Sequence, residues 1–174
     1  MSRFSTLHIP SPPTLAVLAF VALMMAAPAA FARDLQGRLG LGYNAEFSNF
    51  QLQHGVPGVS LKYGFTRDLG AELIVGVSTA SPTNSVTGVK FFKNLFYETN
   101  LNFYFMVGGA ILSAETRSGA ELLGGFGAEF FIPGVDSLGF AMETGASFEN
   151  LTTGTFALKT LGVSFLNAGI HFYF

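Results

Sequence analysis

Apolar and non-apolar residues alternate with a period of two along most of this chain. In the stretch from Leu39 to Phe47, the apolar residues are Leu39, Leu41, Tyr43, Ala45 and Phe47. The residues between them, from Gly40 to Glu46, are small or polar. A period of two places every apolar side chain on one face of a β-strand, and it does not fit the spacing that a helix requires. The stretch is therefore predicted to be a strand with one apolar face.

The same alternation recurs and predicts eight strands in all. They cover residues 39–47, 59–65, 69–77, about 86–95, 102–108, 121–130, 138–149 and 166–174. In the fourth stretch, Phe92 and Lys93 blur the pattern. Before the last strand the parity changes, because Leu161 and Val163 occupy the opposite register. This change predicts a β-bulge or the end of the apolar band at that place.

The connections between these strands alternate in length. Those after the second, fourth and sixth strands are short, at residues 66–68, 98–100 and 132–137. Those after the first, third, fifth and seventh are longer and polar, at residues 48–58, 78–85, 113–119 and 150–159. Such alternation is typical of a membrane barrel with tight turns on one side and loops on the other. The predicted fold class is all-β, a single eight-stranded antiparallel up-and-down transmembrane β-barrel.

The composition indicates which face of this barrel looks outward. Of the chain, 49% is hydrophobic and only 11% is charged. The interior of an eight-stranded barrel is just wide enough to be filled by side chains, so it cannot hold the apolar faces of all the strands. Leu, Val and Phe are therefore expected to face lipid, while glycines and the sparse charges face the lumen. A secreted lipocalin-like barrel would reverse the faces, but the chain has no Trp and hence no Gly-x-Trp motif.

Charge and composition also argue against several classes of function. The formal net charge of −2 provides no broad basic surface, so nucleic acid is not an expected partner. The absence of cysteine excludes disulfides, thiolate metal sites and a cysteine nucleophile. No spacing of His, Asp and Glu suggests a metal site, and no cofactor is expected.

The first 32 residues have the features of a secretory signal peptide. Arg3 precedes a polar stretch, and an uncharged apolar run follows from Leu15 to Ala27. This run is shorter than the roughly 20 residues that a membrane-spanning helix needs, and Pro28 would interrupt its extension. Cleavage is predicted after Ala32, with cleavage after Ala29 as the weaker option. The chain is thus divided into a signal peptide at 1–32 and an outer-membrane β-barrel at 33–174.

Ordering the inward residues by height places a group of polar side chains in the lower and middle lumen. They are Arg38, Lys62, Glu72, Lys90, Tyr104, Glu129, Glu143 and His171. Because unpaired charges in so narrow a space are strongly unfavourable, we expect an ion-pair and hydrogen-bond network that plugs the barrel. A gated, very narrow ion path through the same residues is the functional alternative. Higher up, Glu46, Glu121 and Glu149 lack matched bases and are expected to form an acidic outer mouth, either a solvated rim or a surface that attracts cations.

The chain resembles the small outer-membrane β-barrels of Gram-negative bacteria, similar to OmpA-like and OmpX-like barrels. The resemblance covers residues 33–174, and its most specific element is the ending, in which Ile170, Phe172 and Phe174 alternate with polar or small residues. This ending resembles the C-terminal strand signal read by the barrel assembly machinery. The resemblance implies outer-membrane lipid, periplasmic chaperones and that machinery as partners. No segment resembles the peptidoglycan-binding domain of OmpA, so tethering is not expected.

Enzymatic activity is not expected, although lipid-modifying outer-membrane enzymes also use eight-stranded barrels. The sequence lacks the His-x-Ser pattern of lipid A deacylase barrels and the loop set of the palmitoyltransferase barrels. His54 could pair with Ser48, Ser81 or Ser85 across loops, but a lone loop histidine is ordinarily solvated. The expected function is a structural or surface-interaction role in the outer membrane, with a possible extracellular ligand bound by the loops. A lipid-modifying enzyme and a narrow, porin-like pore are the alternatives.

Overall fold

In the computed structural model, the fold is described for residues 34–44, 58–79, 83–114, 117–151, 156–161 and 166–174, all within one compact unit, Phe31–Phe174. They contain the strands β1 (Leu39–Asn44), β2 (Gly58–Gly64), β3 (Leu69–Ser78), β4 (Asn84–Glu98), β5 (Leu101–Ala114), β6 (Arg117–Phe131), β7 (Leu138–Leu151), β8 (Phe156–Thr160) and β9 (Asn167–Tyr173). Among these residues, no helix is long and apolar enough to cross a membrane. The predicted signal peptide lies outside them and stays a prediction.

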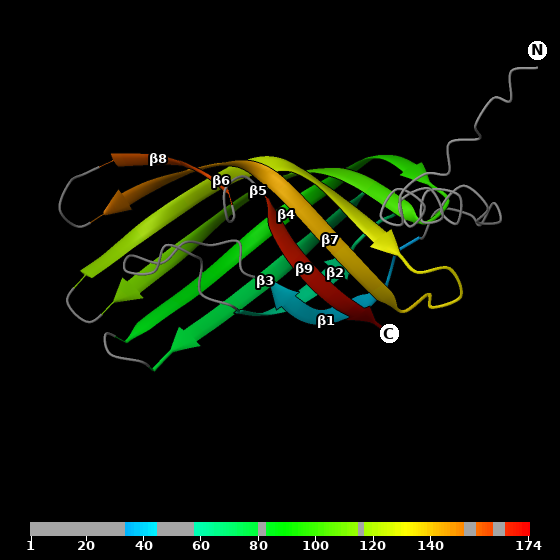
Figure 1. Ribbon diagram of the computed structural model, residues 1–174, viewed down its shortest axis with the longest axis horizontal. Helices are drawn as coiled ribbons and strands as arrows, with labels where there is room; N and C mark the ends of the chain where they lie inside the picture. Colours follow the sequence, from blue (N-terminus) through cyan, green and yellow to red (C-terminus); the bar gives the residue numbers. More distant parts are fainter. Residues whose placement is uncertain (1–33, 45–57, 80–82, 115–116, 152–155, 162–165) are drawn as a thin grey trace, which may run out of the picture. The chain divides into compact units, whose positions relative to one another are not determined.

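The strands form one antiparallel sheet that closes on itself. Neighbours follow the order β6-β5-β4-β3-β2-β1-β9-β7, and pairing of β6 with β7 completes the circle. β8 and β9 pair with successive parts of β7, so together they occupy the eighth position around the barrel (Figure 1). The predicted all-β, eight-stranded antiparallel barrel is thereby confirmed as the fold. We call the end with the β2–β3, β4–β5 and β6–β7 connections the turn end, and the opposite end the loop end.

The eighth position is interrupted where the sequence changes parity. β7 advances three residues from Glu143 to Ala146, whereas its partner advances seven residues from Thr160 to Asn167. Four extra residues therefore lie in the eighth position. Because four is an even number, odd-numbered residues point inward both before and after the interruption. What changes is the position of the apolar residues: Leu161 points inward, with 2% of its surface exposed. The predicted irregularity is confirmed here, while a second register shift, between Asn94 and Phe96 of β4, was not predicted.

The loop-end connections differ from expectation. A long polar loop was predicted over residues 113–119, but β5 and β6 are separated only by residues 115–116. Ser113 pairs with Ser118 and Ala114 with Arg117, so the expectation is wrong. A ladder of backbone hydrogen bonds does not require an alternation of apolar side chains. The strands therefore continue beyond the point at which the alternation ends. The four strands β4 to β7 reach 14 or 15 residues, longer than the predicted ranges 86–95, 102–108, 121–130 and 138–149.

The two faces of the closed sheet carry the residues that the alternation assigned to them. On the outward face, Leu41 is 48% exposed and Phe91 is 55% exposed. On the inward face, Lys62, Glu72 and His171 are each exposed by 2% or less. The apolar side of the alternation thus looks outward, and the charged side chains lie inside.

Glycines face the largest inward rings across neighbouring strands. Gly127 pairs with Tyr104, and a Cβ atom added to it would lie 2.5 Å from the tyrosine ring. Gly70 pairs with Phe92, and an added Cβ would lie 2.1 Å from that ring. Missing side chains thus make room for tall ones, which is how so narrow a barrel holds large rings.

Candidate functional site

The centre of the barrel holds lysines and glutamates that contact one another. Lys90 Nζ lies 3.0 Å from Glu72 Oε2 and 2.8 Å from Glu143 Oε1. Lys62 Nζ lies 2.9 Å from Glu129 Oε2. All five residues are buried, and they come from the five strands β2, β3, β4, β6 and β7. These contacts therefore link strands on different sides of the barrel.

His171 of β9 lies between the two ion-paired groups. Its Nε2 is 3.0 Å from Glu72 Oε1, and its Nδ1 is 3.5 Å from Glu129 Oε1. Ser60 Oγ is 2.9 Å from the same Nε2. A positive charge on the imidazole would bring cations and carboxylates in this group to three each. His171 thus joins the contacts of Lys90 to those of Lys62.

Hydroxyl and amide groups complete the surroundings of the carboxylates. The Tyr104 hydroxyl donates to Glu143 over 2.5 Å, and the Tyr173 hydroxyl donates to Glu129 over 2.6 Å. Asn44 Nδ2 donates to Glu143 over 3.3 Å. We call the group of Lys62, Glu72, Lys90, Tyr104, Glu129, Glu143, His171 and Tyr173 the ionic cluster. Tyr104 belonged to the expected group, whereas the roles of Tyr173, Asn44 and Ser60 were not predicted.

Arg38 contacts the ionic cluster at Tyr173 and not at a glutamate. Its Nη1 donates to the backbone carbonyl of Asp136 over 3.2 Å, and its Nη2 donates to the carbonyl of Tyr173 over 3.3 Å. The guanidinium carbon lies 5.6 Å from the centre of the Tyr173 ring. Arg38 therefore sits at the turn end, where it fastens β9 and the β6–β7 turn instead of pairing with a glutamate of the cluster. The expectation that Arg38 takes part in the ion pairs of the lumen is corrected accordingly.

Apolar side chains fill the interior on both sides of the ionic cluster. One buried apolar cluster includes Phe92 and Tyr104 beside the ion pairs and extends from them toward the loop end; its members are Ile74, Val86, Phe92, Tyr104, Met106, Ala110, Leu112, Leu123 and Leu161. Toward the turn end, Leu35, Phe131 and Tyr173 form a smaller one. These layers were not predicted, because the inward face was expected to carry glycines and charges. Their parity could have revealed them, because Ile74 and Met106 follow the inward positions of Glu72 and Tyr104 by two residues.

The expected acidic outer mouth is also revised. Lys159 Nζ donates to both carboxylate oxygens of Glu149, over 2.7 and 2.6 Å, so Glu149 does have a matched base. The sequence analysis placed Lys159 in a loop, but it belongs to β8 and pairs with Ser147 across the sheet. Glu121 faces Glu149 across β6 and β7, is fully buried and has a partner of its own. Glu46 lies outside the described residues.

Ser60, His171 and Glu129 are arranged in the order of a nucleophile, a base and an acid. The serine and the acid lie on opposite nitrogens of the ring, as in a catalytic triad, but Nδ1 makes no hydrogen bond to Glu129 over 3.5 Å, and Glu72 also lies 3.0 Å from Nε2. All three side chains are 1% exposed or less, so a substrate carbonyl does not reach them in this conformation. His54, Ser48 and Ser81, considered for catalysis from the sequence, lie outside the described residues. Within the part of the chain that the structure describes, no three His, Asp or Glu side chains are arranged to hold a metal ion.

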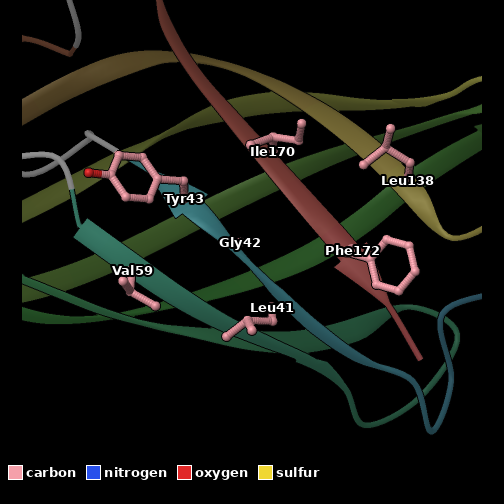
Figure 2. A pocket seen from close by; sticks show the side chains of 7 residues that line it. All are labelled: Leu41, Gly42, Tyr43, Val59, Leu138, Ile170 and Phe172. Carbon is pink, nitrogen blue, oxygen red and sulfur yellow. The ribbon is translucent and has the colours of Figure 1, made fainter.

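A shallow apolar groove of about 440 Å³ lies on the outer wall (Figure 2). It is lined by Leu41, Gly42, Tyr43, Val59, Leu138, Ile170 and Phe172. The groove thus crosses β1, β2, β7 and β9 and is separate from the ionic cluster. The residues predicted to form a C-terminal assembly signal, Ile170, Phe172 and Phe174, face outward with 40%, 47% and 70% of their surface exposed.

Comparison with solved structures finds one similar fold to report. The N-terminal β-barrel domain of Pseudomonas aeruginosa OprF matches with 13% sequence identity and a TM-score of 0.49, over 79% of this chain and 96% of that chain. No protein-family model matches the sequence, and a search of the curated proteins finds no match. The assignment of the fold therefore rests on the strand pairing of this protein itself.

Proposed function

We propose that this protein is an integral β-barrel of the bacterial outer membrane, exported with a cleaved signal peptide, that has a structural or surface-interaction role. The observation that carries the proposal is the orientation of the faces. Apolar residues such as Leu41, Val75 and Phe91 are exposed on the outer wall, whereas the lysines and glutamates of the ionic cluster are buried inside. A water-soluble protein would expose the charges and bury the apolar residues.

Backbone hydrogen bonding supports the same proposal. In hydrocarbon, every backbone N–H and C=O must be paired within the protein, and a closed sheet does this without leaving an edge. The pairing of β6 with β7 closes this sheet. Strands of about 9 to 11 residues suffice for a tilted crossing, so strands of 14 or 15 residues such as β4 to β7 can span a membrane and project beyond it.

The ionic cluster and the two apolar layers support the proposal that the interior is filled and does not conduct ions. An ion moving along the axis would have to separate Lys90 from two glutamates and then displace side chains such as Met106 and Leu161, which are 0% and 2% exposed. Breaking a buried ion pair costs about 3–5 kcal/mol. We therefore assign the barrel a role as a scaffold for its loops, which would carry any extracellular ligand site.

The geometry of the C-terminal strand supports the proposal that the outer-membrane assembly machinery inserts this barrel. Ile170, Phe172 and Phe174 form an exposed outward row, while the intervening His171 and Tyr173 are buried. Before lipid covers the outer wall, this row is therefore accessible to a protein that binds the C-terminal strand. Periplasmic chaperones and the barrel assembly machinery are the partners that we propose during biogenesis.

A matched pair of substitutions tests the orientation of the faces. Val75→Lys places a charge on the outer wall, and Val135→Lys places the same charge in the β6–β7 turn. A lysine facing the membrane core costs about 2–4 kcal/mol, falling to about 0–1 kcal/mol near the interface. On SDS gels, the folded, membrane-extracted protein is expected to migrate differently before and after boiling. The unboiled, folded band of V75K should disappear at a lower urea concentration than that of the wild type, whereas the band of V135K should not. Equal behaviour of the two variants would contradict the proposal.

The filled interior is tested separately in planar lipid bilayers. The reconstituted protein is expected to give no steady single-channel currents. Steady currents that vanish on replacing Lys62 or Glu143 would show that the ion pairs form a conducting path, and would overturn the scaffold role.

A further inference from the structure

The outer wall of the barrel is almost free of charge. Among the described side chains on the outward face of the strands, the charged ones are Lys93 of β4 and Glu98, the last residue of that strand. Lys93 is exposed. Within the described part of the chain, it has no hydrogen bond or ion pair. The ammonium group of Lys93 is therefore free to take a partner from outside the protein.

The strand register places Lys93 at the height of the β2–β3 turn. Lys93 pairs with Leu69, the first residue of β3, and the backbone N–H of Asn94 donates to the carbonyl of Asp68 in the turn over 2.7 Å. A turn at the end of a membrane barrel lies at the water boundary. Val75 lies six residues further along β3, which is a height of about 14 Å for a strand tilted by about 45°. Lys93 is therefore at the membrane boundary, and Val75 is deep in the apolar band.

Aromatic rings surround this position. Lys93 pairs with Phe105 on its other side, and the Phe105 ring lies 5.5 Å from that of Phe126. The rings of Phe96 and Phe103 stack at 4.7 Å on the neighbouring part of β4 and β5. Aromatic residues mark the level of lipid headgroups on outer-membrane barrels. The long lysine stem can lie along this apolar surface while its ammonium group reaches the headgroup level.

Two other charged residues near the turn, Asp68 and Arg67, contact Tyr97. The Tyr97 hydroxyl contacts Asp68 Oδ1 at 2.5 Å, and the Arg67 guanidinium lies 4.5 Å from the centre of the Tyr97 ring. Glu98 lies five residues beyond Lys93 along β4. Lys93 thus remains available to a ligand of opposite charge.

From these observations we infer that Lys93 binds the phosphodiester group of a phospholipid in the leaflet at the turn end. The ammonium group donates to the phosphate, and the acyl chains lie over the outward apolar side chains of β3, β4 and β5. This inference rests on the proposed membrane location, and it adds a specific lipid contact that the location alone does not require.

Native mass spectrometry of the detergent-extracted barrel tests the lipid contact, with phosphatidylglycerol as the probe. We expect K93Q to retain about tenfold less bound lipid than the wild type, and K93R to retain a wild-type amount. The matched control is K159Q, which removes a lysine from the loop end that already pairs with Glu149. Diacylglycerol with the same acyl chains, which lacks phosphate, should bind neither variant nor wild type above background. Inorganic phosphate should not displace the bound lipid. Equal lipid retention by K93Q and the wild type, or equal binding of diacylglycerol, would overturn the inference.

Depth measurements keep this inference separate from the proposed function. The chain has no cysteine, so K93C and V75C can each carry a single spin label. In phospholipid vesicles, we expect the label at 75 to be accessible to oxygen and shielded from a water-soluble relaxation agent, and the label at 93 to lie at headgroup level. A water-exposed label at 75 would overturn the membrane location itself. A label at 93 as deep as that at 75 would overturn only the phospholipid site.

Discussion

Two lysine–glutamate contacts in the same barrel differ in their surroundings. At the centre, Lys90 lies between Glu72 and Glu143, and all three side chains are 1% exposed or less. At the loop end, Lys159 pairs with Glu149, but the lysine is 43% exposed. Water screens the second contact and does not reach the first. The comparison indicates that burial, more than the distance between the charged atoms, decides how much each pair contributes to keeping the barrel closed.

The largest effect is expected from Lys90→Met. The variant removes one cation and leaves two buried carboxylates without it, and breaking a buried pair in this way costs about 3–5 kcal/mol. The free energy of unfolding should fall by that amount in a urea titration of the protein in lipid or detergent. A loss below about 1 kcal/mol would mean that water enters the central cluster, and the contrast with the loop end would disappear.

Tyr104→Phe sharpens the comparison by removing one hydrogen bond to Glu143 without removing a charge. Hydrogen bonds to charged groups contribute about 1.5–3 kcal/mol, so the free energy of unfolding should fall within that range. Tyr43→Phe is the matched control, because Tyr43 lies on the outer wall and is 50% exposed. If both variants lose the same stability, the Tyr104 hydroxyl has no special role in the central cluster.

Gly127→Ala tests whether the space around the cluster is as tight as the register implies. The added methyl group would lie 2.5 Å from the Tyr104 ring, and overpacking of this kind costs about 1–3 kcal/mol. Gly124→Ala on the same strand is the control, since the nearest atom to its Cβ lies at 3.8 Å. The unfolding midpoint should drop for G127A alone, and a drop of the same size for G124A would point to strand propensity instead.

The smallest effect is expected from Lys159→Gln at the loop end. Exposed ion pairs contribute about 0–1 kcal/mol. Water reaches Lys159, but Glu149 is only 2% exposed, so the free energy of unfolding should fall by about 1 kcal/mol, at the upper end of that range and well below the loss for K90M. Because exposed pairs are screened, added salt should shrink the difference between K159Q and the wild type, while leaving the effect of K90M unchanged. A loss for K159Q as large as that for K90M would show that the two ends of the interior do not differ.

Much of the interior could be predicted from the sequence because inward positions follow a simple parity. Lys62, Glu72, Lys90, Glu129, Glu143 and His171 were all placed inside on that basis, and the structure finds them buried. Their contacts could not be predicted in the same way. Lys62 pairs with Glu72 in the strand register, yet its ammonium group contacts Glu129 on β6, across the lumen.

The loop end was harder to predict, and the reasons are physical. Lys159 was assigned to a loop because the apolar alternation had stopped, but backbone pairing with β7 continues to Phe156. Glu149 therefore looked unpaired when its partner was only one strand away. The inward apolar layer was overlooked because a residue such as Val86 stands alone between Ser85 and Thr87, which gives no run of apolar residues to notice.

The sequence by itself determined three features. The period-two pattern determined the number of barrel positions, since the geometry of a strand assigns every second residue to the same face. The alternating lengths of the connections determined the antiparallel order, and the narrow lumen of an eight-stranded barrel determined which face looks outward. Only the tertiary structure decided which charges meet. The reason is that closure of a tilted sheet brings residues from distant strands together across the interior, and their relative heights depend on the register of every strand between them.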